Sequence, residues 1–114
     1  MFNLISRSPD SPLEVEEVIR FIKNRWGVTY ELRILVKGKS LYLQMMWRFL
    51  EQQSFPLSEE EFLERTAAVI DVINRIDKSS YVRNWLLNVN ESPRVVRAIS
   101  LPLRGDERLE EFVL

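Results

Sequence analysis

Three arginines near the C-terminal end of the chain, Arg94, Arg97 and Arg104, have the side-chain type best suited to holding an anion. A guanidinium group forms two parallel hydrogen bonds with a phosphate or a carboxylate. Together with Arg83, these residues make the C-terminal part locally basic and raise the hypothesis of a nucleic-acid or phospholigand-binding module. Scattered solubilising charge is the simpler interpretation, because the net charge of −1 gives no long-range field that would attract nucleic acid.

Groups for bond-making chemistry are scarce in this sequence. The chain contains neither cysteine nor histidine, which removes thiolate nucleophiles, thiolate or imidazole metal sites and the commonest general base near neutral pH. Its three glycines are too few and too far apart for a glycine-rich phosphate loop. We therefore expect no enzyme, no cofactor and no metal. The alternative is an unrecognised enzyme that uses Tyr, Lys, Arg or carboxylate groups in a pocket.

A second candidate site follows from alternation along two predicted strands. Alternate residues of a strand share one face of a sheet, and one such set contains Arg33, Leu35, Tyr42, Gln44, Met46 and Arg48. Tyrosine, methionine and arginine are enriched at protein interfaces. We expect this face to bind another protein; a plain solvated face, or cover by the C-terminal segment, is the competing interpretation. Trp47 and Phe49 are predicted to face inward.

The strands that carry this face are predicted over residues 28–36 and 41–49, where apolar residues recur at every second position. Lys37-Gly38-Lys39 supplies a short turn between them. A helix should precede this hairpin, beginning with Ser11 as N-cap and Pro12 in its first turn, and ending at about Trp26 before Gly27.

Two helices and a strand should follow the hairpin. Ser58 and Glu61 form a capping-box pattern that opens a helix from Glu59 to about Ile76. Residues 81–89 suggest a shorter helix capped by Ser79 or Ser80. Residues 95–103 read as a third strand that Pro102 confines to a sheet edge. Leu109, Phe112 and Val113 suggest a last short helix.

The predicted fold class is α+β: a small antiparallel three-stranded sheet, made of the hairpin and the C-terminal strand and packed by helices, in the order α-β-β-α-α-β-short α. Residues 1–10 lack any periodicity and are expected to form a flexible tail, which leaves 11–114 as a single domain. No apolar run approaches the ~18 residues of a membrane helix, so we expect no membrane insertion.

The run from Leu41 to Glu59, LYLQMMWRFLEQQSFPLSE, resembles the central motif of a small family of domains of unknown function found in cyanobacteria and plastids. Residues 25–30 (RWGVTY), 97–103 (RAISLPL) and the closing EFVL agree with it. The likeness covers about residues 13–114. It implies a role in oxygenic phototrophs, in the assembly or regulation of the photosynthetic machinery, and supplies no catalytic residues.

The sequence thus predicts a non-enzymatic accessory or adaptor domain that acts through protein–protein binding. The absence of cysteine fits a reducing compartment, so we expect the cytoplasm. The N-terminal residues are too polar for a signal peptide and too few for a plastid transit peptide.

Overall fold

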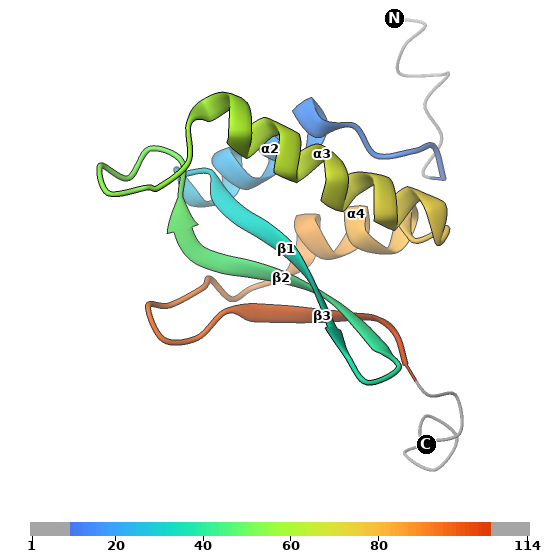
Figure 1. Ribbon diagram of the computed structural model, residues 1–114. Coiled ribbons are helices and arrows are strands. Elements are labelled where there is room, and N and C mark those ends of the chain that lie inside the picture. Colours follow the sequence, from blue (N-terminus) through green and yellow to red (C-terminus); the bar gives the residue numbers. More distant parts are fainter. Residues whose placement is uncertain (1–9, 106–114) are drawn as a thin grey trace, which may run out of the picture.

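The structure, a computed structural model, describes residues 10–105 and contains three helices and three strands within that range. These elements are α2 (Val15–Trp26), β1 (Tyr30–Lys37), β2 (Ser40–Phe49), α3 (Glu59–Arg75), α4 (Ser79–Asn88) and β3 (Ile99–Arg104). Their order confirms the α+β prediction (Figure 1). The predicted short helix at Leu109–Val113 and the tail over residues 1–9 lie outside the described residues.

The strands form one antiparallel sheet in the order β1-β2-β3. Lys37 pairs with Ser40 across a two-residue turn, in which Gly38 has a φ of 63°. A positive φ at the first central position is the signature of the type II′ turn that suits hairpins. β3 lies beside β2 at the edge, as Pro102 predicted, since proline cannot donate a hydrogen bond to a further strand.

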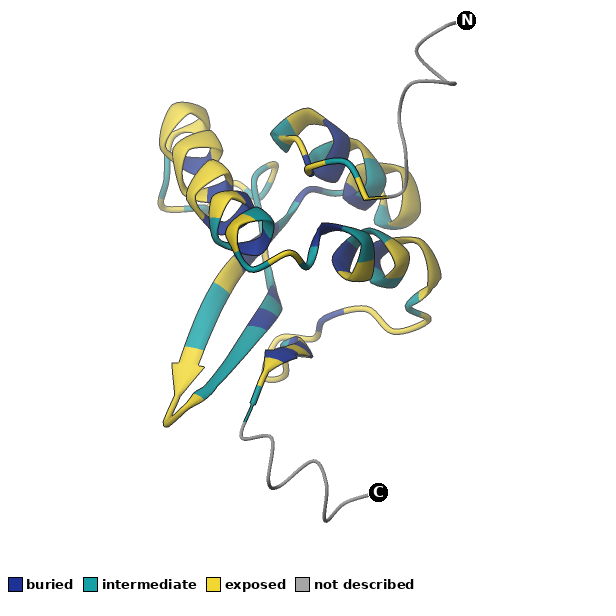
Figure 2. Ribbon diagram, turned by 90° about the vertical axis from the view of Figure 1, so that its right-hand side faces the viewer, coloured by how far each residue is buried: buried dark blue, intermediate teal, exposed yellow. Residues whose placement is uncertain are grey.

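All three helices lie on one side of the sheet, and the core lies between the two layers (Figures 1 and 2). Every element contributes buried apolar side chains to it, as the burial colours of Figure 2 show. The sheet supplies Leu32, Leu43, Met45, Ile99, Leu101 and Leu103, and the helices supply Val18, Ile22, Val69, Ile70, Ile73, Val82 and Leu86. None of the helices in residues 10–105 has the length and apolar character that crossing a membrane requires.

The start of α3 confirms the predicted capping box. The Ser58 hydroxyl accepts a hydrogen bond from the Glu61 backbone N–H (3.1 Å), and the Glu61 carboxylate accepts one from the Ser58 N–H (2.9 Å). Two predicted caps were wrong, because α2 begins at Val15 after Glu14 and α4 begins at Ser79 after Lys78, both without a side-chain cap.

Tertiary contacts explain the late start of α2. The Asn74 side chain of α3 accepts a hydrogen bond from the Leu13 N–H (2.9 Å) and donates one to the Leu13 carbonyl (3.1 Å). Leu13 itself is buried in the core. Ser11 and Pro12 therefore belong to a segment held by α3, and the helix begins after it.

Trp47 and Phe49, which were predicted to face inward, are only half-buried. Neither side chain is part of the buried core. The pairs Tyr30↔Phe49 and Leu32↔Met45 enclose one residue of β1 but three of β2, so β2 bulges opposite Glu31. Trp47 lies within this bulge and Phe49 at its end, and their rings meet edge to face, with centroids 6.0 Å apart.

The third strand begins four residues later than predicted, at Ile99. Val95 and Val96 form a tight turn, because Arg94 and Arg97 exchange two backbone hydrogen bonds of 2.8 and 2.9 Å. Both valines project into solvent, Val96 with 94% of its surface exposed.

Candidate partner-binding face

The outer face of the sheet is the side opposite the helices, and it collects the predicted partner-surface residues. The outer-face residues alternate with core residues along each strand, so the face is set by the strand period. Within residues 10–105, no helix lies over this face (Figure 2). The strand pairing places on it Arg33 and Leu35 of β1, Tyr42 and Gln44 of β2, and Ser100 and Pro102 of β3; the predicted Met46 lies in an irregular stretch of β2 outside this register.

A hydrogen-bonded polar row crosses all three strands of this face. The Arg33 Nε donates to the Gln44 side-chain oxygen at 2.9 Å. The amide nitrogen of the same Gln44 side chain donates to the Ser100 hydroxyl at 2.9 Å. Because Gln44 uses both ends of its amide, its orientation and that of the Arg33 guanidinium are fixed before any partner arrives.

An apolar row lies next to the polar one. Leu35 pairs with Tyr42, and Tyr42 pairs with Pro102. Leu35 and Tyr42 are half-buried, whereas Pro102 is exposed. A flat apolar strip beside fixed hydrogen-bonding groups has the character of an interface centre with a polar rim.

Arg48 has an internal role that its sequence position did not reveal. Its Nη2 lies 2.8 Å from Oε1 of Glu31, whose side chain is only 10% exposed. Its guanidinium carbon also lies 5.8 Å from the centre of the Phe55 ring. Arg48 thus neutralises a nearly buried carboxylate, and its charge is already used within the chain.

The three C-terminal arginines do not converge on one point. Arg94 and Arg97 face each other across the tight turn, whereas Arg104 ends β3. Arg97 and Arg104 are seven positions apart, and β3 occupies most of that stretch; an extended chain of that length spans about 23 Å. The structure therefore places a pair of exposed arginines at one end of β3 and a single arginine at the other.

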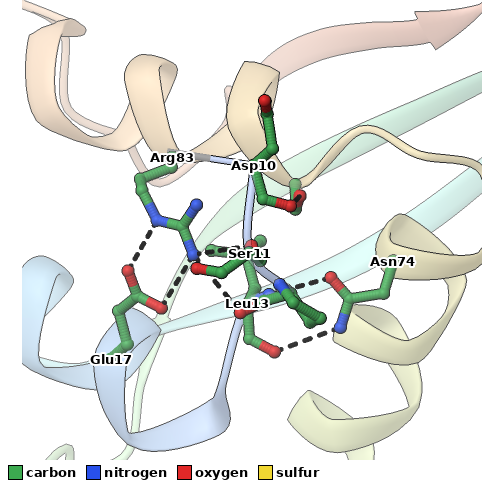
Figure 3. A network of polar contacts seen from close by, with 8 residues as sticks. Asp10, Ser11, Leu13, Glu17, Asn74 and Arg83 are labelled. Carbon is green, nitrogen blue, oxygen red and sulfur yellow. Dashed lines mark hydrogen bonds and ion pairs between the residues drawn. The ribbon is translucent and has the colours of Figure 1, made fainter. Parts of the chain in front are cut away.

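Arg83, the fourth basic residue of that region, belongs to a polar network between helices (Figure 3). Its Nε and Nη2 lie 2.7 and 3.1 Å from the Glu17 carboxylate of α2, and both side chains are nearly buried, with 12% and 8% exposed. Nη2 also donates to the Ser11 carbonyl at 3.1 Å. Glu17 carries no local signal of this pairing in the sequence, because its partner lies 66 positions away.

Glu51 closes the hairpin at its open end. It accepts hydrogen bonds from the Thr29 N–H (2.8 Å) and hydroxyl (2.7 Å) and lies 3.4 Å from the Lys23 ammonium. Burial raises the pKa of Glu51, but the hydrogen bonds from Thr29 and Lys23 outweigh it and lower that pKa below the usual 4.5. A carboxylate held in its charged form by three donors is a structural clamp and a poor general base.

Other sites for chemistry are sparse in the described part of the chain. A shallow pocket of about 170 Å³ is lined by Ser80, Arg83, Asn84 and Leu87. Between residues 10 and 105, no three acidic side chains come together as metal ligands would. Of the predicted sites, the outer face is therefore the one whose members the structure assembles.

Comparison with known proteins gives a family and a solved relative. A family model described as "Domain of unknown function (DUF3067)" matches residues 16–113. The solution NMR structure of the Alr2454 protein from Nostoc sp. strain PCC 7120 is similar, with a TM-score of 0.76 and 28% sequence identity over 90% of this chain and 98% of that chain. No curated protein matches the sequence.

Proposed function

This chain belongs to the DUF3067 family, a domain of unknown function, and from that premise we propose that it is a non-catalytic accessory domain that binds another protein through the outer face of its sheet. The absence of cysteine and histidine from the sequence supports a role in recognition over one in catalysis. Turnover of a metabolite by the purified protein would contradict this part of the proposal.

The observation that carries the proposal is that two rows lie side by side on a face that no helix of residues 10–105 covers. Tyr42 stands in the middle strand, between Leu35 and Pro102. A tyrosine in such a position offers a large contact area at a small cost in side-chain entropy. The neighbouring row of Arg33, Gln44 and Ser100 is already linked by its own hydrogen bonds. Less side-chain entropy is therefore lost when a partner binds.

The setting we propose is an oxygenic phototroph, where the protein would serve the assembly or regulation of the photosynthetic machinery. Two findings support this setting: the sequence resembles a family of cyanobacteria and plastids, and the solved relative comes from Nostoc. We propose the cytoplasm as its compartment, since a chain without cysteine fits a reducing environment.

A matched pair of tyrosine variants tests the proposed surface. Tyr42 lies on the outer face, whereas Tyr81 lies on α4 with 43% of its surface exposed. Tagged wild-type, Tyr42→Ala and Tyr81→Ala proteins would be used to capture partners from a cyanobacterial extract, with quantitative mass spectrometry of what is retained. We expect Tyr42→Ala to lose a protein that wild type and Tyr81→Ala both retain.

A photo-crosslinking side chain provides the second readout. Placed at position 42, it should form a covalent adduct with that same protein; placed at Ala68, on the exposed side of α3, it should not. Equal retention by the Tyr42→Ala and wild-type proteins, or equal crosslinking from both positions, would reject the outer face as the binding surface.

A further inference from the structure

The two edges of the sheet are not equivalent. The β3 edge is interrupted by Pro102 and by a bulge, in which β3 has one extra residue opposite Leu41 and Tyr42. A proline and a bulge each prevent a further strand from pairing with an edge. β1 contains neither a proline nor an extra residue. We propose that a second copy of this chain pairs with β1 in the antiparallel sense, which joins two three-stranded sheets into one.

The hairpin register determines which backbone groups are available on β1. Lys37 and Ser40 flank a two-residue turn, and residues in that position exchange hydrogen bonds with each other. Because hydrogen-bonded and non-hydrogen-bonded pairs alternate along antiparallel strands, the backbone groups of Arg33 and Leu35 also form hydrogen bonds with β2. The N–H and C=O groups of Leu32, Ile34 and Val36 therefore point away from the sheet.

The same three residues carry apolar side chains that become less covered toward the tip of the hairpin. Leu32 is buried, Ile34 is half-buried and Val36 is 66% exposed. Figure 2 shows the cause: the end of the hairpin extends beyond the helical layer. The edge thus combines backbone groups that no strand of residues 10–105 pairs with and, at Ile34 and Val36, β-branched side chains, which favour cross-strand pairing.

Like charges disfavour the two registers adjacent to the proposed one. With the two-fold axis at Ile34, Ile34 faces the partner's Ile34 and Leu32 faces the partner's Val36. Glu31 then lies opposite the partner's Lys37, and Arg33 lies opposite the partner's Leu35. Moving the axis to Arg33 would oppose two arginines, and moving it to Leu35 would set Arg33 against the partner's Lys37; like charges in directly opposed positions destabilise a pair.

This self-complementarity favours a second copy over an unrelated strand as the occupant. The same segment supplies both sides of every pair, as a two-fold interface requires. The inference is independent of the proposed function, because it uses the edge of β1 and leaves Tyr42 and the rest of the outer face free.

Single cysteines test the register directly, because the chain has no cysteine of its own. In the proposed register, Ile34→Cys places two thiols on residues whose Cα atoms are about 5.5 Å apart, within the range of a disulfide. Val36→Cys places them four residues apart along the strands, about 14 Å. We expect disulfide-linked dimer to form at least ten times faster from Ile34→Cys than from Val36→Cys, although position 36 is the more exposed of the two.

Sedimentation measurements on variants without an introduced cysteine test dimer formation in a second way. They depend neither on crosslinking nor on the folding of the cysteine variants. We expect Val36→Lys to raise the dimer dissociation constant at least tenfold, and Val96→Lys, at a still more exposed valine of the Arg94–Arg97 turn, to leave it unchanged. Faster crosslinking from position 36, an unchanged dissociation constant in Val36→Lys, or a wild-type protein that stays monomeric at millimolar concentration would each overturn the proposal.

Discussion

Replacing Arg83 with methionine should cost this protein a large part of its stability. The change keeps an unbranched apolar stem but leaves the Glu17 carboxylate, whose side chain is 8% exposed, without its guanidinium partner. Removing one member of a buried ion pair typically costs about 3–5 kcal/mol. A domain of this size has a total stability of about 5–15 kcal/mol, so the variant should be close to unfolding at room temperature.

A double-mutant cycle separates the lost ion pair from lost packing. Glu17→Met alone should also destabilise the fold, because it leaves the Arg83 charge buried. The double variant buries no charge, and replacing a buried pair by apolar side chains is often nearly neutral. We therefore expect the double variant to be more stable than either single one, with a coupling free energy of about 2 kcal/mol or more.

Urea unfolding followed by tryptophan fluorescence measures each free energy, since the chain has three tryptophans. The matched control is Arg75→Met, which removes an exposed ion pair to Asp71 on α3, where the side chains are 76% and 58% exposed. That change should cost less than about 0.5 kcal/mol. Equal losses from Arg83→Met and Arg75→Met, or losses that simply add in the double variant, would refute the reasoning.

Three further predictions concern smaller contacts. Because its pKa is lowered on folding, Glu51 contributes stability that is present above its unfolded value of 4.5 and is lost as the pH falls through the lower folded value. The stability difference between wild type and Glu51→Gln should therefore shrink in urea titrations carried from pH 7 to pH 3; a constant difference would contradict it. Ser58→Ala should cost about 1 kcal/mol by loss of its cap, measured by thermal unfolding against Ser54→Ala, a loop serine for which we expect little change. Arg48→Ala should lower the free energy of unfolding by about 1–3 kcal/mol because Glu31 loses its ionic partner, and an unchanged urea midpoint would show that this pair contributes nothing.

Features set by neighbouring residues could be predicted from the sequence. The hairpin around Gly38 and the capping box of Ser58 depend on residues a few positions apart, and their signals are local. The alternation along both strands also predicted which side chains share the outer face. Pro102 predicted an edge strand because its missing N–H has a direct consequence for pairing.

Features set by distant residues could not be predicted. Glu17 and Arg83 lie 66 positions apart, and nothing in either neighbourhood indicates the other. The bulge of β2 around Trp47 could not be predicted either, because the alternation itself carries no mark of where a strand will bend. The role of Arg48 was hidden for the same reason, since a charged residue on a strand is ordinarily solvated.

The position of β3 has a consequence for how the chain acquires its fold. Gln44 of the central strand meets Ser100 across 56 positions, with α3 and α4 in between. Contacts of such long sequence separation form late, because closing the chain costs entropy before the contact is gained. During synthesis, the second side of β2 must therefore remain unpaired until α3, α4 and β3 have left the ribosome. Pulse-labelling hydrogen exchange during refolding should show the amides of β1 protected before those of β3, and simultaneous protection would rule out this order.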